Sequence, residues 1–351
     1  MKKLKLTCAH AIVKHLIAQK ILIDGKKQPL FPGVFGIFGH GNVACLGQAL
    51  EENKDKLPTY RGHHEQNMAL TGVADSRAKR RKQIFIATSS VGPGSTNLLT
   101  AAAVAMSNRI PILFLPGDTY ANRMPDPVLQ QVEHFNNPGI TANDAFKPVT
   151  RYFDRITRPE QILQSLPQAI QLMIDPADAG PACLSLCQDT QGETFDYPEE
   201  FFKERVHNIR RPKPDDFEIK KAAEKIKSCK NPIIISGGGV FYSDAMEELG
   251  NFAIKHNIPV TQTVMGYSTM KRDHSHFLGP IGGLGGKAAN NFAKKTDLAI
   301  AVGTKLADFT TGSWANFENP DFGLVSLNIT RHDANKHLAQ AVVGDAKVSL
   351  I

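Results

Sequence analysis

Apolar residues in the first half of the chain fall into short continuous runs that alternate with stretches of helical periodicity. The runs have the length of buried strands, and they lie at residues 33–38, 84–88, 111–115 and 181–186. Apolar side chains at helical spacing predict an opening helix at residues 8–18, with Thr7 as its N-cap. Because strands and helices alternate, we expect an α/β fold with a parallel sheet.

The second half repeats this alternation. Predicted strands lie at residues 232–236, 259–262, 298–303 and 324–329, and predicted helices lie at residues 219–229 and 245–256. We expect residues 324–329 to be the last strand. The stretch between the halves is polar and rich in proline, which favours an interdomain connection. The sequence therefore predicts two doubly wound parallel-sheet domains, residues 1–190 and 216–351, joined by a linker at residues 191–215.

Residues 119–150 interrupt the pattern. Hydrophobic periodicity is lost there, and prolines occur at Pro125, Pro127, Pro138 and Pro148. Long irregular segments are uncommon inside compact domains and are usually functional. We expect this segment to cover a site or an interface.

Composition adds few constraints. The chain has 351 residues, of which 42% are hydrophobic and 21% are charged, so it can bury two separate cores. No apolar stretch has the length of a membrane helix, and the N-terminus lacks the pattern of a secretory signal. We therefore predict a cytoplasmic protein with no membrane partner.

The net charge is +7, and the densest basic run lies at residues 77–82. This run has no interleaved aromatic residues and lies between a predicted helix and a predicted strand, so we interpret it as a solvated connection and expect no nucleic-acid partner. The five cysteines are odd in number and scattered, which favours reduced thiols. Cys183 and Cys187 fit a buried strand as small hydrophobes, and no metal site is predicted.

Glu65 is the first candidate for chemistry, because it begins a predicted helix directly after a short strand. Doubly wound folds bind ligands at the carboxyl ends of their strands. Taken alone, a glutamate in a first helical turn usually favours the helix dipole. The neighbouring His63 and His64 cannot share a metal, since adjacent residues on a helix face different ways.

Three glycine-rich loops follow predicted strands. Residues 39–42 and 92–97 can present backbone N–H groups to a ligand, although such loops often only turn the chain. Residues 237–239 suggest a dinucleotide site, but no acidic residue ends the next strand to hold a ribose. A close backbone turn is the favoured interpretation of this third loop.

Together these motifs resemble the thiamine-diphosphate-dependent enzymes of the acetolactate synthase and pyruvate decarboxylase type. The likeness lies in His64-Glu65-Gln66, in the Gly-Pro-Gly-Ser-Thr-Asn loop at residues 92–97, and in residues 297–311. Within the family, residues 62–71 and 116–123 resemble the branch that hydrolyses a trihydroxycyclohexane-dione in inositol catabolism. The resemblance spans the whole chain.

The resemblance implies roles for individual residues. Glu65 would be catalytic, because a carboxylate beside the cofactor pyrimidine favours the imino tautomer that removes the thiazolium proton. The cofactor cavity would be lined by Glu65, Gly92, Gly94, Ser95 and Asn97. His40 would contact the substrate or move a proton, although a plain capping loop is an equally good interpretation of residues 39–42.

The resemblance also implies a reaction and an assembly. The expected reaction is the hydrolytic opening of a cyclic diketone to a deoxyglucuronate, with thiamine diphosphate and magnesium as cofactors. The family has three domains, and the motif that holds magnesium and diphosphate in the third is not found in these 351 residues. We therefore expect an inactive N-terminal portion whose site is completed in a homo-oligomer. A carboligase resembling acetolactate synthase or glyoxylate carboligase, and a non-catalytic truncated subunit, remain as alternatives.

Overall fold

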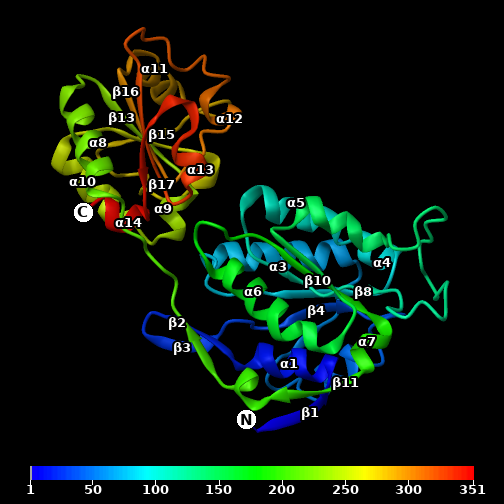
Figure 1. Ribbon diagram of the computed structural model, residues 1–351. Helices are drawn as coiled ribbons and strands as arrows, with labels where there is room; N and C mark the ends of the chain where they lie inside the picture. Colours follow the sequence, from blue (N-terminus) through cyan, green and yellow to red (C-terminus); the bar gives the residue numbers. More distant parts are fainter. Residues whose placement is uncertain (1) are drawn as a thin grey trace. The chain divides into compact units, whose positions relative to one another are not determined.

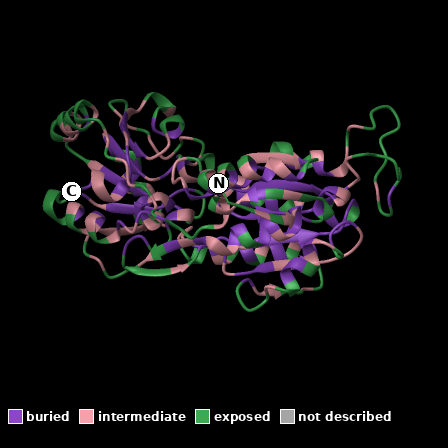
Figure 2. Ribbon diagram, turned by 60° about the horizontal axis from the view of Figure 1, so that its bottom comes forward, coloured by how far each residue is buried: buried purple, intermediate pink, exposed green. Residues whose placement is uncertain are grey.

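The computed structural model describes residues 2–351 and divides into two compact units, one ending at Ile209 and the other beginning at Arg210 (Figure 1). Each unit is built on a parallel sheet with helices packed against it, so the predicted α/β fold class is confirmed. The central strands of the sheet are buried in both units (Figure 2). Among the described residues, no helix is long and apolar enough to cross a membrane.

The first unit contains a seven-stranded sheet with the order β5-β4-β6-β7-β10-β8, and β9 also pairs with β10. All of these pairs are parallel. The strands are β4 (Val34–Ile37), β5 (Thr59–Tyr60), β6 (Ile86–Ser89), β7 (Leu113–Phe114), β8 (Gly117–Asp118), β9 (Tyr152–Ile156) and β10 (Ala182–Cys187). Their carboxyl ends therefore meet at one edge, where ligands bind in folds of this kind.

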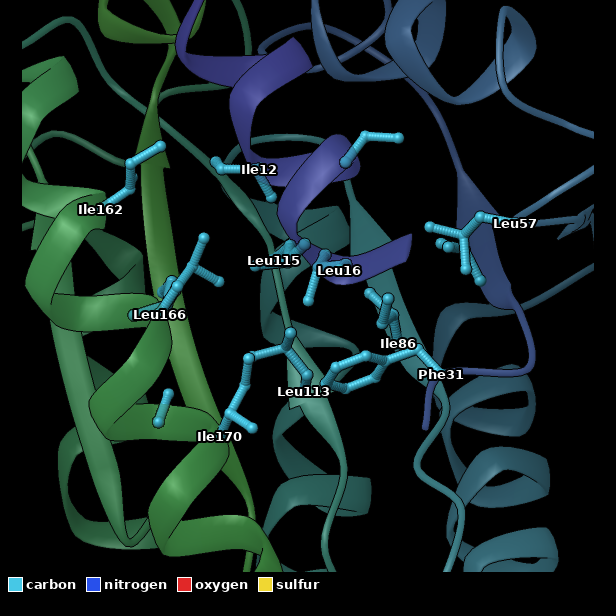
Figure 3. Close-up of a cluster of buried hydrophobic side chains, with 14 of the residues drawn as sticks. Ile12, Leu16, Phe31, Leu57, Ile86, Leu113, Leu115, Ile162, Leu166 and Ile170 are labelled. Atoms are coloured by element: carbon cyan, nitrogen blue, oxygen red, sulfur yellow. The ribbon is translucent and has the colours of Figure 1, made fainter. Parts of the chain in front are cut away.

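Helices cover this sheet on both sides (Figure 1). They are α1 (Cys8–Ala18), α2 (Leu46–Glu51), α3 (Glu65–Ala78), α4 (Pro93–Thr96), α5 (Leu99–Asn108), α6 (Ile162–Ile174) and α7 (Gln188–Gly192). The side chain of Thr7 accepts a hydrogen bond from the His10 N–H and caps α1, as predicted. Leu16 of α1 and Leu166 of α6 lie in one buried core together with Ile86 of β6 and Leu113 of β7 (Figure 3).

The predicted linker at residues 191–215 differs from the structure, because most of it belongs to the first unit. It contains β11 (Thr194–Pro198), which pairs antiparallel with β1 (Lys3–Thr7). It also contains β12 (Arg205–His207), which pairs with β2 (Gln19–Ile23), and β2 in turn pairs with β3 (Lys26–Pro29). Tyr197 anchors the segment, since its ring is fully buried and its hydroxyl donates to the carbonyl of Pro159 at 2.9 Å.

The second unit has a six-stranded parallel sheet with the order β15-β14-β13-β16-β17-β18. Its strands are β13 (Pro232–Ser236), β14 (Val260–Gln262), β15 (Phe277–Pro280), β16 (Leu298–Val302), β17 (Gly323–Asn328) and β18 (Gln340–Val343). The prediction that residues 324–329 form the last strand is wrong, because β18 follows at the edge of the sheet. Its four residues are too few to show a period.

Separate cores lie on the two faces of this second sheet. One core contains side chains of α8 (Asp216–Ser228) and α10 (Met246–His256), and the other contains side chains of α11 (Lys287–Lys295). At the carboxyl end of β13, a Cβ on Gly237 would lie 2.5 Å from the carbonyl oxygen of Gly303, and one on Gly239 would lie 2.5 Å from the Gly303 Cα. The glycines let two backbone segments touch, which supports the close-turn interpretation.

Candidate functional site

Glu65 is the first residue of α3 and follows β5 after a four-residue turn. The turn ends at His64, whose backbone is extended and whose Nδ1 accepts the Gln66 N–H at 3.2 Å, so His64 caps the helix. The Glu65 side chain points into the unit, and the residue is only 9% exposed. A carboxylate that serves only the helix dipole does not need this burial.

The two carboxylate oxygens of Glu65 have different surroundings. Oε2 accepts a hydrogen bond from the Asn97 side-chain amide at 2.9 Å, whereas no described residue donates a hydrogen bond to Oε1. A Cβ on Gly94 would lie 3.3 Å from Oε1 and would clash with the hydroxyl oxygen of Ser90. The lack of a side chain at Gly94 thus lets the loop backbone approach Ser90 and Glu65 Oε1 closely, and Oε1 keeps the capacity to accept a further hydrogen bond.

The loop at residues 92–97, which we call the cofactor loop after the role that the family resemblance implies for it, is held from two sides. Gly92 has a φ of +66°, and a Cβ there would clash with the carbonyl oxygen of Gln130. The hydroxyl of Ser95 donates a buried hydrogen bond to the side-chain oxygen of Asn143. The structure therefore brings Gly94 and Asn97 to Glu65, while Gly92 and Ser95 anchor the same loop.

His40 lies in the neighbouring loop, residues 39–42. Its carbonyl oxygen accepts a hydrogen bond from the Val91 N–H at 3.0 Å, which ties this loop to the connection between β6 and α4. The amide of Asn42 donates to Thr88 Oγ1 at 2.8 Å and fixes the loop on β6. No described hydrogen bond joins His40 to Glu65. The imidazole Nδ1 is buried and has no partner among residues 2–351.

Two glutamines of α7 complete the surroundings of His40, and sequence reasoning missed both. The Gln188 amide nitrogen lies 3.5 Å from His40 Nε2, and the Gln191 amide donates to the Gly41 carbonyl at 2.5 Å. The side-chain oxygens of both glutamines are buried without a partner in the described part of the chain. Both residues follow the carboxyl end of a buried strand, where folds of this kind bind ligands, but the polar composition around them suggested a connection between domains instead.

Asn143 was also missed. It lies in η1 (Ala142–Val149), inside the stretch that the sequence marked only as irregular. Its contact with Ser95 joins residues 48 positions apart, and no short motif encodes such a pair. Within residues 2–351, no three His, Cys, Asp or Glu side chains gather to hold a metal ion.

Comparison with protein families and curated proteins adds an independent finding. The family described as "Thiamine pyrophosphate enzyme, N-terminal TPP binding domain" matches residues 20–137, and "Thiamine pyrophosphate enzyme, central domain" matches residues 219–351. A 3D-(3,5/4)-trihydroxycyclohexane-1,2-dione hydrolase of Clostridium tetani is 49% identical over 350 residues, which is 100% of this chain and 54% of the relative.

Two further relatives carry the same description. A hydrolase of Clostridium perfringens is 48% identical over 347 residues, and a hydrolase of Bacillus cereus is 47% identical over 351 residues. These alignments cover 99% and 100% of this chain and 54% of each relative. The chain thus spans about half the length of the curated relatives that it matches.

Proposed function

Because the chain belongs to the thiamine pyrophosphate enzymes and carries their N-terminal and central domains, we propose that its protein hydrolyses a carbon–carbon bond in a cyclic 1,2-diketone. The substrate would be the trihydroxycyclohexane-1,2-dione that the relatives' descriptions name. The observation that carries this proposal is the buried Glu65 carboxylate, which accepts a hydrogen bond from Asn97 at one oxygen and none from the described residues at the other.

The residues around Glu65 fit the pyrimidine of thiamine diphosphate (thiamine pyrophosphate). When bound, the cofactor supplies the nucleophilic carbon and the electron sink that this cleavage requires. Glu65 Oε1 would accept a hydrogen bond from a protonated ring nitrogen and hold the proton there. Asn97 would keep the carboxylate oriented, and Gly94 would let the loop backbone lie close against that carboxylate. Burial strengthens this interaction, because the local dielectric constant is lower than in water.

His40 and Gln188 would face the substrate. Opening the ring adds one water across the bond between the two carbonyl carbons, so that one becomes a carboxylic acid and the other an aldehyde. The aldehyde carbon must receive a proton, and a histidine can deliver one near neutral pH. His40 is the candidate donor, since its Nδ1 is unpartnered among the described residues and its ring lies beside the Gln188 amide.

Magnesium belongs to the same proposal. The resemblance to the family implies that the metal and the diphosphate are held by a third domain, whose motif these 351 residues do not include. The experiments below therefore use the full-length protein that carries this chain.

The test is Glu65→Gln, which keeps the size of the side chain and removes its charge. We expect hydrogen–deuterium exchange at the reactive thiazolium carbon of the bound cofactor to fall by about a hundredfold to ten-thousandfold, because a neutral amide cannot stabilise the protonated pyrimidine. Turnover of the cyclic diketone should fall in parallel. Glu52→Gln is the matched control, since Glu52 is an exposed carboxylate that pairs with His10, and it should leave the exchange rate unchanged.

A folded Glu65→Gln protein with the wild-type exchange rate would overturn the assignment of Glu65. Wild-type protein that exchanges the proton but converts pyruvate or glyoxylate in place of the cyclic diketone would instead support the carboligase alternative. Thermal unfolding of each variant separates a chemical effect from a loss of fold.

A further inference from the structure

An irregular stretch of chain leaves the first unit between β8 and η1 and returns to it. We call residues 119–140 the covering segment; it projects from the unit and is largely exposed (Figures 1 and 2). Its carbonyl at Gln130 packs against Gly92 of the cofactor loop. A movement of this segment would therefore also move the loop beside Glu65.

Arg155 of β9 ties together the two ends of the covering segment. Its guanidinium donates from Nε to Asp118 Oδ2 at 2.9 Å, from Nη1 to the Gly139 carbonyl at 3.3 Å, and from Nη2 to Thr141 Oγ1 at 2.8 Å and Asp144 Oδ2 at 2.7 Å. Asp118 directly precedes the segment, whereas the other acceptors lie at its end. One planar side chain thus holds the two ends of the covering segment together.

A second set of contacts leads from Asp118 inward to the cofactor loop. The hydroxyl of Ser185 donates to Asp118 Oδ2 at 2.5 Å, and the Asn143 amide donates to Ser185 Oγ at 2.7 Å and to the Gly117 carbonyl at 3.0 Å. The Ser95 hydroxyl then donates to the Asn143 side-chain oxygen. These four side chains belong to buried residues, so each lost hydrogen bond leaves a group that water cannot satisfy.

We propose that Arg155 is a positioning residue, which fixes the cofactor loop beside Glu65 through two connections. One connection runs through Asp118, Ser185 and Asn143 to Ser95, and the other runs through the covering segment to Gly92. Arg155 donates no hydrogen bond to Glu65 or to the cofactor loop, so its effect on the site is indirect. The inference rests on the proposed function only because its experiment measures proton exchange on the bound cofactor.

Arginine is the residue type that this role requires. Its fork reaches acceptors in three directions at once, and lysine has a single ammonium group that cannot reproduce the geometry. Arg155→Lys keeps a positive charge near Asp118, so the buried carboxylate is not left unpaired and the fold should survive. Arg155→Met removes the charge as well. The matched control is Arg158→Met, because Arg158 is an exposed arginine that pairs with Glu160 at 2.6 Å.

The experiment compares these variants in the full-length enzyme by three measurements. These are the affinity for thiamine diphosphate, the exchange rate at the thiazolium carbon with saturating cofactor, and the rate of tryptic cleavage after Arg123 in the covering segment at a temperature well below unfolding. For Arg155→Lys we expect faster cleavage after Arg123 and an exchange rate lower by about a hundredfold, the scale of a misplacement of about 1 Å. Arg155→Met should show larger effects, and Arg158→Met should match the wild type in all three.

A folded Arg155→Lys enzyme with wild-type exchange, cofactor affinity and tryptic cleavage overturns the inference. A fall in thermal stability without any of these changes also overturns it, because a purely structural residue would behave in that way. If the wild type does not hydrolyse the cyclic diketone, the proposed substrate fails, but cofactor exchange and cleavage after Arg123 still test Arg155 on their own.

Discussion

At the scale of single residues, Gly92 lets the covering segment touch the cofactor loop. Its φ of +66° lies in the left-handed region, and a Cβ there would clash with the Gln130 carbonyl. We expect Gly92→Ala to lower the free energy of unfolding by about 1–3 kcal/mol and to weaken binding of thiamine diphosphate, since either the loop or the segment must move. Denaturant unfolding and cofactor titration measure the two effects.

Gly25→Ala separates backbone strain from the clash. Gly25 has a φ of +74°, but a Cβ there would meet no atom within 4 Å. This variant should therefore show only the cost of a left-handed alanine, about 1–2 kcal/mol, and normal cofactor binding. If Gly92→Ala and Gly25→Ala behave alike, the contact with Gln130 has no role in holding the loop.

Residues within short motifs could be predicted as candidates, and residues joined across the sheet could not. Glu65 and the cofactor loop each lie in a contiguous motif, and the structure places Asn97 against the carboxylate. Asn143 and Gln188 reach the same region only because parallel strands bring their carboxyl ends to one edge. Which polar side chains then bond depends on packing that hydrophobic periodicity does not describe.

At the scale of elements, α1 and the segment after α7 are joined by a buried histidine. His15 of α1 stacks on Phe201 at a centroid distance of 4.0 Å, and its Nδ1–H donates to the Phe201 carbonyl at 2.7 Å. Burial lowers the pKa of His15 from 6.5 to about 4, the Phe201 hydrogen bond opposes the shift, and the positive charges of Arg205 and His207 add to it. The folded unit thus holds this imidazole neutral.

This depressed pKa predicts the sign of an acid effect. Between pH 6.5 and about 4 the unfolded chain binds a proton at His15 that the folded chain does not, so stability is complete above pH 6.5 and falls as the pH is lowered toward 4. The shift corresponds to about 3 kcal/mol. We expect His15→Gln to be less stable at neutral pH but to lose less stability between pH 7 and pH 5, as measured by denaturant unfolding.

His256→Gln is the control for this effect, because His256 is exposed in the last turn of α10. It should retain the wild-type loss of stability between the two pH values. An unchanged acid loss in a folded His15→Gln protein would show that other groups cause it.

Buried elements could be predicted from the sequence far better than edge elements. The strands β4, β6, β10 and β13 are buried or half-buried at every position, and each lies within or overlaps its predicted range. The strands β1, β11 and β12 are short and partly exposed, and their mixed polarity resembles that of a linker. Their pairing depends on partners about 190 residues away, which a local pattern cannot indicate.

At the scale of the whole molecule, each unit has its own sheet and its own core, and the features of the candidate site all belong to the first unit. The fold class followed from the alternation of strands and helices along the chain. The extent of the first unit did not, because residues 191–209 return to pair with strands near the N-terminus. Composition alone cannot distinguish an exposed edge of a sheet from a connection between domains.

The exposed apolar side chains of the covering segment lead to a prediction about assembly. It exposes large apolar side chains at Met124, Leu129, Val132, Phe135 and Ile140, and those of Met124 and Phe135 are 91% and 92% exposed. Apolar groups gathered on one exposed segment are typical of protein interfaces. The resemblance to the family implies a cofactor site completed by a second subunit, and this segment contacts the cofactor loop at Gly92. We therefore predict that the full-length protein self-associates through a second copy of the same chain.

Sedimentation at micromolar concentration tests this prediction. The double variant Met124→Ser and Phe135→Ser should shift the protein toward monomers, because each substitution removes an apolar side chain that a partner would bury, at about 25 cal/mol per Å² of buried apolar surface. Leu338→Ser is the matched control, since Leu338 is a fully exposed apolar residue of the second unit that lies in no such segment, and it should leave the assembly unchanged.

Wild-type protein that sediments only as a monomer would contradict self-association, and a wild-type assembly in the double variant would place the interface elsewhere. Assembly should also fall together with cofactor affinity in the double variant, because the covering segment that a partner would press into place is the one that packs against Gly92.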